Sequence, residues 1–286
     1  MKIVLKESAP AKINLFLKVL DKREEGYHNI DTMMHKIGLC DTITLEIETD
    51  KDMSVTVSCD DHSVPENEDN ICYKAAKLYL DSFGMKDVSV KVAIEKRIPS
   101  AAGLGGGSSD AAATLNALNK YFKKTDTLSL ASLSASIGAD VPFFVCEYKA
   151  AHCLGIGEII TPCEPLEGGC VLLAKCSEGI SAGAGYKALD SVKYERRSSE
   201  NILNALKNAD YDSVMKNLYN SFEYAVFPLI TDAERAKNIM LTHRASGALM
   251  SGSGPTVMGF FNSEEKALGA KDELLKTGYT VALTSL

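Results

Sequence analysis

A glycine-rich stretch near the middle of the chain constrains the fold more than any other part of the sequence. Residues 103–109 read GLGGGSS, between an alternating apolar segment over 88–94 and an Ala- and Leu-rich segment to about Tyr121. Because glycine lacks a Cβ, this backbone can take positive φ or approach a ligand closely. A strand, a glycine-rich turn and a helix in this order predict an anion site at the helix N-terminus that suits phosphates. The alternative is a flexible connecting loop without a ligand.

Two familiar phosphate-binding patterns fit this stretch badly. The P-loop pattern GxxxxGK[ST] is absent from the sequence. The dinucleotide pattern GxGxxG can begin at Gly103, but Ser108 stands where its third glycine belongs. Asp126 follows at a suitable distance for a ribose contact, so a dinucleotide enzyme remains an alternative.

Length and composition predict a globular protein of two domains. The 286 residues correspond to about two domains at roughly 150 residues each, and we expect them to span 1–160 and 161–286. Hydrophobic residues make up 45% and charged residues 24%, which excludes disordered and collagen-like classes. The net charge of 31 − 38 = −7 argues against a nucleic-acid partner. No apolar run approaches the ~18 residues of a membrane span, so we expect no membrane partner.

The eight cysteines predict thiols rather than a metal site or a disulfide framework. They stand at positions 40, 59, 72, 146, 153, 163, 170 and 176. None has the CxxC spacing or the Cys/His pattern of a zinc site. Disulfide-rich frameworks belong mostly to short secreted domains, and the first residues do not resemble a signal peptide. We therefore expect the cysteines to pack as small hydrophobic residues in a reducing cytoplasm.

Hydrophobic periodicity predicts a mixture of strands and helices. Apolar residues alternate within 11–20, which predicts a half-buried strand with Lys12 and Asn14 together on its other face, and a polar turn over 21–26 follows. The other predicted strands are 43–47, 53–59, 88–94, 171–174, 248–250, 257–261 and 279–283. The predicted helices are 70–83, the segment from the glycine-rich stretch to about 121, 128–137, 181–191, 200–207, 212–224, 231–243 and 264–276.

Several polar residues stand where an ordinary structural role would explain them. Asp69 or Asn70 is placed to cap the first predicted helix. Asp140 follows the helix-ending Gly138, in a loop predicted over 138–142, where aspartate usually forms a cap or a turn. A lysine on a strand is usually solvated. Taken singly, none of these residues indicates a function.

Together, five segments indicate a family. The segments, in order, are APAKINLFL (9–17), GYHNI (26–30), PSAAGLGGGSSDAAA (99–113), GADVPFF (138–144) and SGSGPTV (251–257). On these segments the chain resembles the galacto-, homoserine, mevalonate and phosphomevalonate (GHMP) kinase superfamily over essentially its whole length. The first two are more specific to the branch that phosphorylates 4-diphosphocytidyl-2-C-methyl-D-erythritol in the non-mevalonate isoprenoid pathway. The resemblance implies an α+β fold with a first domain like the second domain of ribosomal protein S5 and a second, ferredoxin-like domain.

The resemblance also implies roles for individual residues. Asp140 is similar to the family's catalytic aspartate, and Lys12 to its lysine partner. ATP is expected at Pro99, Ser100, Ala101, Ala102, Gly103, Leu104, Gly105, Gly106, Gly107, Ser108 and Ser109, with Asn70 and Lys96 on the adenosine side. The cytidyl-diphosphate-linked polyol is expected at Asn14, Tyr27, His28, Ile156 and Tyr186. Mg²⁺ is expected with ATP, on Ser108 or Ser109, in a monomer or weak homodimer.

The sequence departs from the family pattern at two places. Ala101 and Ala102 stand where glycine is common, and alanine is tolerable there only if φ stays negative. A Ser-Thr pair is expected at the segment that begins with Ser181 and Ala182. Alanine cannot donate a hydroxyl hydrogen bond, which puts a polar substrate contact there in doubt.

The implied chemistry is attack of the 2-hydroxyl on the γ-phosphate of ATP. Asp140 would accept or orient the hydroxyl proton, while Lys12 would keep that carboxylate ionised and offset charge on the transferred group. One alternative is a sister kinase for another alcohol, which the aromatic residues Tyr27, His28 and Tyr186 disfavour. A second is a nucleotide-binding regulator without turnover, which the presence of both Lys12 and Asp140 disfavours.

Overall fold

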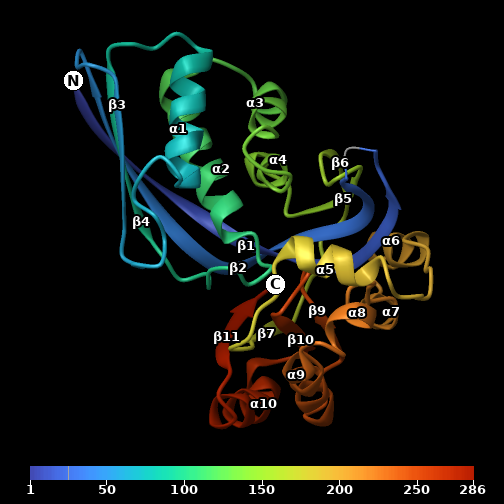
Figure 1. Ribbon diagram of the computed structural model, residues 1–286. Coiled ribbons are helices and arrows are strands. Elements are labelled where there is room, and N and C mark those ends of the chain that lie inside the picture. Colours follow the sequence, from blue (N-terminus) through green and yellow to red (C-terminus); the bar gives the residue numbers. More distant parts are fainter. Residues whose placement is uncertain (25) are drawn as a thin grey trace. The chain divides into compact units, whose positions relative to one another are not determined.

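The computed structural model describes residues 1–24 and 26–286, and the chain forms two compact units (Figure 1). Unit 1 comprises residues 1–11, 40–100 and 105–148, and unit 2 comprises 12–39, 101–104 and 149–286. Two long strands, β1 (Lys2–Lys22) and β2 (His28–Thr49), contribute residues to both units. The predicted division at residue 160 stays a prediction.

Unit 1 is a sheet with helices packed against one face. Its further elements are β3 (Ser54–Cys59), α1 (Ile71–Ser82), β4 (Val88–Glu95), α2 (Gly106–Phe122), α3 (Thr127–Ser134) and α4 (Val141–Val145). The strand order is β3-β4-β2-β1, with β3 and β4 parallel and β4 and β2 antiparallel. Helices α1 and α2 lie side by side (Figure 1) and bury the apolar face formed by residues such as Ile43, Leu45 and Val90.

Unit 2 contains the rest of β1 and β2 and a separate four-stranded sheet. Its helices are α5 (Ala182–Leu189), α6 (Glu200–Lys207), α7 (Tyr211–Lys216), α8 (Glu223–Val226), α9 (Thr231–Thr242) and α10 (Glu264–Lys276). Its strands are β5 (Ala150–Leu154), β6 (Ile159–Pro162), β7 (Cys170–Lys175), β8 (Tyr219–Asn220), β9 (Gly247–Met250), β10 (Val257–Phe261) and β11 (Thr280–Ser285). The second sheet has the order β11-β7-β10-β9, and α9 and α10 bury its apolar side chains.

The predicted helix 70–83 and the predicted strand over 11–20 are confirmed, but the expectation that this strand is only half-buried is wrong. α1 begins after Asn70, whose side-chain oxygen accepts a hydrogen bond from Cys72 N (2.8 Å). Along β1, however, residues 11–17 are buried on both faces, with Lys12 5% and Asn14 1% exposed. Alternation of apolar residues indicated one buried face correctly, but it carries no information about what covers the polar face.

The predicted helix over 212–224 is also wrong. The segment divides into α7, the two-residue strand β8 and α8. Backbone pairing with β1 decides this, since Tyr219 and Asn220 lie parallel to Phe16 and Leu17. A local helical pattern cannot report a partner that lies about 200 residues earlier in the chain.

Three smaller differences concern turns and short strands. Ala101 has φ +52°, so the condition that its φ stays negative is wrong. The loop predicted over 138–142 is shorter, because α4 begins at Val141 with proline in its first turn. β5 and β6 form a hairpin that the sequence patterns missed. The predicted turn over 21–26 includes Glu25, which lies outside the described residues.

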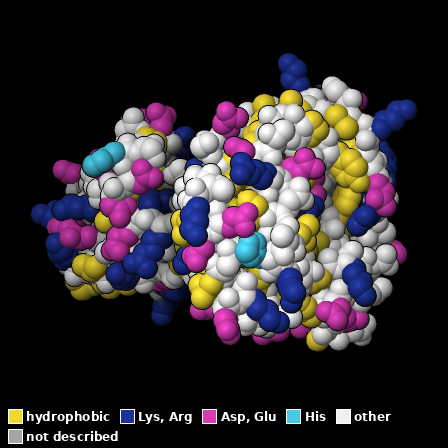
Figure 2. Space-filling model, turned by 90° about the horizontal axis from the view of Figure 1, so that it is seen from below, with side chains coloured by type: hydrophobic (Ala, Val, Ile, Leu, Met, Phe, Trp, Pro, Cys, Tyr) yellow, Lys and Arg dark blue, Asp and Glu magenta, His cyan; other side chains and the backbone are white. Residues whose placement is uncertain are grey.

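The expectations for thiols and for the surface can be compared with the described residues. All eight cysteines are thiols rather than disulfides, and six of them are buried. On the face shown in Figure 2, acidic and basic side chains are interspersed. Along residues 1–24 and 26–286, no helix is both long and apolar enough to cross a bilayer.

Candidate active site

In unit 1 the glycine-rich stretch opens a long helix with its N-terminus free of acidic side chains. α2 begins at Gly106 after Gly105, which has φ +69°, and its first turn contains Gly106, Gly107 and Ser108. A Cβ on Gly106 would lie 3.0 Å from the Ile98 side chain, so glycine lets the helix start pack closely on the preceding segment. The unsatisfied N–H groups and the helix dipole make this end a site for anions.

In unit 2 the first part of the same stretch is held by two other motifs. Ser251 Oγ donates a hydrogen bond to Gly103 O (3.1 Å), and Lys12 N donates to Leu104 O (2.9 Å). Gly103 has φ +72°, and a Cβ there would lie 2.5 Å from Ser251 O. Glycine is therefore required at 103 by both the backbone conformation and the close approach of the second glycine-rich turn.

Beneath the start of α2, Lys96 joins two buried carboxylates. Lys96 Nζ contacts Asp41 Oδ2 and lies 2.8 Å from Asp110 Oδ2, and all three side chains are at most 8% exposed. Asp41 Oδ1 also accepts hydrogen bonds from the backbone N–H groups of Arg97 and Ile98. The ammonium group of Lys96 is thus neutralised inside unit 1, where it links β2, the end of β4 and α2.

The pKa values in this cluster follow from burial. Burial, together with the nearby Asp41, raises the pKa of Asp110 to about 7 although Lys96 opposes the shift. Burial lowers the pKa of Lys96, but the two carboxylates outweigh it and hold the pKa above its ordinary value. Among the described residues, Asp110 Oδ1 and Ser109 Oγ are buried without a hydrogen-bond partner. Both atoms belong to the first two turns of α2, which follow the predicted phosphate-binding turn.

The loop that contains Asp140 lies near the start of α2 within unit 1. Ser108 Oγ is 3.9 Å from the position that a Cβ on Gly138 would occupy. Asp140 precedes α4 as its N-cap residue without a side-chain capping bond, and it is partly exposed. The side chain of Asn70 is occupied at the start of α1, where it caps the helix and donates to Pro65 O (2.6 Å).

In unit 2, Lys12 is the first member of a chain of hydrogen bonds. Lys12 Nζ donates to Asn14 Oδ1 (2.8 Å), and Asn14 Nδ2 donates to Thr32 Oγ1 (2.8 Å). Thr32 Oγ1 in turn donates to Phe16 O (2.6 Å). Thr32 was missed by the sequence patterns, because only the pairing of β1 with β2 brings it to this face. These hydrogen bonds fix the rotamers of Lys12 and Asn14, and the lysine side chain would otherwise be flexible.

Two of the predicted substrate residues stack on each other. The rings of His28 and Tyr186 lie 4.8 Å apart at 10°, and Tyr186 meets Phe222 edge-on at 4.9 Å. His28 Nε2 lies 2.7 Å from Asp190 Oδ1. Burial disfavours the ionised form of Asp190, but the contacts to His28 and Lys22 outweigh it and lower its pKa.

Asp190 is a site residue that the sequence patterns missed. It is the C-cap residue of α5, and its partner His28 lies 162 positions earlier, so no local pattern reveals the contact. The other two predicted contacts are less enclosed. Tyr27 is 64% exposed, and the backbone N–H of Ile156 donates to Glu158 Oε2 (2.5 Å).

Lys12 and Asp140 belong to different units, so their pairing stays a prediction. The same holds for the roles carried over to the other predicted residues. Within each unit the structure brings together Ser108 with the Gly138 loop, Lys12 with Asn14, and His28 with Tyr186.

The donor set can be tested for Mg²⁺. In the described part of the chain, no group of three or more His, Cys, Asp or Glu residues could hold a metal ion. Mg²⁺ is usually held by one or two protein oxygens together with substrate phosphates and water. Ser108 is partly exposed at the first turn of α2, whereas Ser109 Oγ is buried. The residues therefore fit a magnesium ion held mainly by nucleotide phosphates, with Ser108 better placed than Ser109.

Comparison with known proteins first defines the class. The family model "GHMP kinases N terminal domain" matches residues 70–148, and "GHMP kinases C terminal" matches residues 202–280. A homoserine kinase from Cytophaga hutchinsonii shares the fold with a TM-score of 0.73 over 99% of this chain and 95% of its own, at 16% identity. Together with the glycine-rich helix start, these matches define a GHMP kinase and confirm the predicted fold class.

Closer relatives define the family within that class. A 4-diphosphocytidyl-2-C-methyl-D-erythritol kinase of Clostridium perfringens is 42% identical over 90% of this chain and 89% of its own length. One from Alkaliphilus metalliredigens is 39% identical over 92% and 90%. A crystal structure of 4-(cytidine 5'-diphospho)-2C-methyl-D-erythritol kinase matches with a TM-score of 0.81 and 31% identity, covering 99% of this chain and 100% of the other. The chain belongs to the 4-diphosphocytidyl-2-C-methyl-D-erythritol kinase family.

Proposed function

We propose that this chain transfers the γ-phosphoryl group of ATP to the 2-hydroxyl of 4-diphosphocytidyl-2-C-methyl-D-erythritol. The products are the 2-phosphate and ADP, and the reaction belongs to the non-mevalonate isoprenoid pathway. The observation that carries the proposal is the match, over 90% of the chain, to relatives that bear this activity in their names. The local geometry of the glycine-rich helix start and of the His28 stack supports it.

The nucleotide phosphates are proposed to lie on residues 103–109 and the N-terminus of α2. The free N–H groups of the first turn donate to phosphate oxygens, and the helix dipole stabilises their charge. Magnesium, when bound with ATP, supplies charge neutralisation at the β- and γ-phosphates, and Ser108 is the proposed protein ligand. Asn70 and Lys96 are proposed to contact the adenosine of ATP. The Lys96 ammonium group is already paired with Asp41 and Asp110, so this contact would use other atoms of Lys96.

Two residues are proposed to act on the reacting atoms. The substrate oxygen forms a bond to the γ-phosphorus while the bond from that phosphorus to the β,γ-bridging oxygen breaks and ADP leaves. Asp140 accepts or orients the hydroxyl proton. Lys12, held by Asn14, offsets the charge on the transferred group.

The cytidine end is proposed to bind at Tyr27, His28 and Tyr186. The exposed ring of Tyr27 supplies a stacking surface, and stacking alone accepts any base. Selectivity for cytosine then needs hydrogen bonds to the base edge. His28 is suited to this task because Asp190 fixes the orientation of its ring through Nε2. Ile156 is proposed as a backbone contact beside it.

One experiment tests the proposal. The protein is incubated with ATP, Mg²⁺ and the cytidyl substrate, and ³¹P NMR follows ADP and the new phosphate monoester. Stoichiometric ADP and 2-phosphate are expected. ADP formed only with another alcohol would replace the proposal by a sister kinase, and the absence of ADP with every alcohol would replace it by a nucleotide-binding regulator.

Compartment and assembly are proposed on narrower grounds. Eight cysteine thiols without a disulfide among the described residues favour a reducing compartment, so the cytoplasm stays our proposal. A monomer or weak homodimer also stays a proposal, which sedimentation velocity at several protein concentrations would test.

A further inference from the structure

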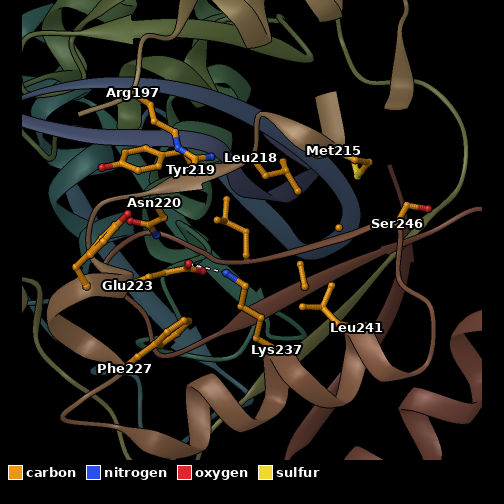
Figure 3. A pocket seen from close by; sticks show the side chains of 14 residues that line it. Arg197, Met215, Leu218, Tyr219, Asn220, Glu223, Phe227, Lys237, Leu241 and Ser246 are labelled. Atoms are coloured by element: carbon orange, nitrogen blue, oxygen red, sulfur yellow. Dashed lines mark hydrogen bonds and ion pairs between the residues drawn. The ribbon is translucent and has the colours of Figure 1, made fainter. Parts of the chain in front are cut away.

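A separate cavity lies wholly within unit 2. Its volume is about 550 Å³, which is typical of small-molecule sites, and none of the residues predicted for ATP or the cytidyl substrate lines it. Its walls come from α7, β8, α8, α9 and β9 (Figure 3). The cavity is therefore distinct from the residues proposed for the reaction, and its ligand is inferred from its own lining.

One part of this lining is apolar. Met215 and Leu218 lie near each other on one side of the cavity, and Leu241 approaches from α9 (Figure 3). The rings of Tyr219 and Phe227 form further wall on the other side. Such walls favour a flat, largely apolar body over an extended polar chain.

The charged groups at the cavity are already paired. Lys237 Nζ lies 2.6 Å from Glu223 Oε2 and 5.5 Å from the centre of the Phe227 ring. Arg197 lies 3.1 Å from Glu195 and 5.5 Å from the centre of the Tyr219 ring. Each cation thus has its own carboxylate and its own ring. A charged ligand would compete with these pairs, above all with the more buried pair of Lys237 and Glu223, so the lining favours a neutral ligand.

The outer edge of β9 supplies the polar part of the lining. Backbone groups on an antiparallel strand point alternately to its two edges. Ser251 N donates across to Thr256 O (2.9 Å), so the groups of the preceding residue, Met250, point to the outer edge. There Glu223 Oε1 accepts from Met250 N (2.9 Å) and Asn220 Nδ2 donates to Met250 O (2.7 Å).

Two residues earlier, the same edge is open. By the two-residue period, Ala248 N–H and C=O also point outward, and Ala248 lines the cavity. β9 pairs with β10 alone, and no side chain of the described residues caps Ala248 as Glu223 and Asn220 cap Met250. A backbone donor and acceptor are therefore presented side by side in the cavity wall, where a ligand with a matching acceptor and donor can pair with both.

We propose that this cavity binds a neutral planar heterocycle or amide that pairs with Ala248 through one acceptor and one adjacent donor. The flat body of such a ligand packs among Tyr219, Phe227 and Leu241. A peptide strand is disfavoured, because strand addition needs open groups on successive alternate residues. Here Asn220 and Glu223 close the edge at Met250, which leaves one residue open.

The probe that tests this site is 7-azaindole, a neutral bicycle with an adjacent N–H and ring nitrogen. Indole is the matched probe, since it has the same shape and lacks the acceptor. In ¹⁵N-resolved NMR titrations of the full chain, 7-azaindole should shift the Ala248 amide resonance. Indole should bind about tenfold more weakly, as the loss of one buried hydrogen bond implies.

A matched pair of variants locates the binding. Leu241 (44% exposed) lines the cavity, and Leu268 (47% exposed) lies on α10 away from it. Leu241→Trp should abolish 7-azaindole binding at concentrations that saturate the parent, and Leu268→Trp should leave it unchanged, with both variants folded by circular dichroism.

Four results would overturn the proposal. They are equal binding of indole, equal binding to both tryptophan variants, shifts confined to residues 103–109, and no shift at all. A Val- and Thr-rich hexapeptide that shifts the β9 amides where 7-azaindole does not would show strand addition instead.

Discussion

At Asp110 the fold places a carboxylate where burial and a second carboxylate oppose its ionisation. Its pKa of about 7 lies above the ordinary value of 3.8, so the folded chain holds this proton more tightly than the unfolded chain does. The contribution to stability is therefore complete below about pH 4. It is lost progressively as the pH rises through about 7.

Replacing Asp110 by Asn should expose this dependence. Asn cannot titrate, so the free energy of unfolding of the parent should fall relative to Asp110→Asn between about pH 4 and 7. Urea unfolding at a series of pH values measures the difference. Asp126→Asn is the control, because hydrogen bonds from Ser129 hold the pKa of Asp126 below its ordinary value and move its titration below that window. A difference in the free energy of unfolding between the parent and Asp110→Asn that does not change with pH would contradict the raised pKa of Asp110.

Asp140 is the residue on which the proposed chemistry depends most. Asp140→Asn keeps the shape of the side chain and removes its capacity to accept the hydroxyl proton. We expect kcat to fall by about 10²–10⁴ while ATP affinity stays within about threefold. Asp81→Asn, an exposed aspartate of α1 in the same unit, should leave kcat unchanged. A kcat within about tenfold of the parent would remove Asp140 from the mechanism.

At the residue scale, the sequence identified candidate site residues but not the side chains that contact them. The order of motifs pointed to Lys12 and Asn14, yet it could not reveal that both are buried or that Thr32 holds them. Asp190 was missed because its partner, His28, lies 162 positions away in the chain. Such partners are set by tertiary pairing, which no local pattern encodes.

At the scale of elements, the glycine-rich loop depends on a second motif for its shape. Gly103→Ala would place a Cβ 2.5 Å from Ser251 O in addition to straining a backbone at φ +72°. Gly84 is the matched control, since it has φ +62° and open space around the Cβ position. Gly84→Ala should cost about 1 kcal/mol of stability and leave the KM for ATP unchanged.

Gly103→Ala should lower the thermal midpoint further and raise the KM for ATP. Differential scanning calorimetry and steady-state kinetics measure the two effects. Equal losses of stability in the two variants, with an unchanged KM for ATP, would show that the contact with Ser251 does not shape the nucleotide site.

Elements with a strong local pattern were predicted well. α1, α2, α6, α9, α10 and the strands of the second sheet follow periodicity and capping residues. The segment 212–224 was not, because the backbone of Ser221 donates to Leu17 O (2.9 Å) and its hydroxyl accepts from Val19 N (3.0 Å). These bonds to β1 replace the helix that local preference alone would form.

At the scale of the whole molecule, the thiols report on the integrity of the fold. Cys40 and Cys163 are the partly exposed cysteines among the eight, and burial raises the pKa of Cys163 to about 11. At pH 8, Ellman's reagent should therefore react first with Cys40, and with all eight thiols after unfolding in guanidinium. Cys40→Ser should remove the fast phase. Fewer than eight thiols in the unfolded, unreduced chain would reveal a disulfide.

The net charge of −7 illustrates what composition can and cannot predict. It is compatible with two anionic substrates only if positive potential is local. The helix start at Gly106 and the side chain of Lys12 are the proposed local sources, whereas Lys96 is excluded because Asp41 and Asp110 neutralise it. A sum of charges over the chain does not show that the charge of a lysine such as Lys96 is neutralised by buried carboxylates.

The chain crosses several times between its two units, and this limits which rearrangements of the gene leave a folded protein. The units consist of three segments each, which alternate along the sequence, so no single break point separates them. A product that stopped after residue 148 would retain Leu17, Val19 and Ile30, whose partners in the core of unit 2 lie beyond that point. Their apolar side chains would then face water and promote aggregation. Neither unit can therefore be exchanged or deleted as one contiguous segment of the sequence, and we expect the two units to evolve together.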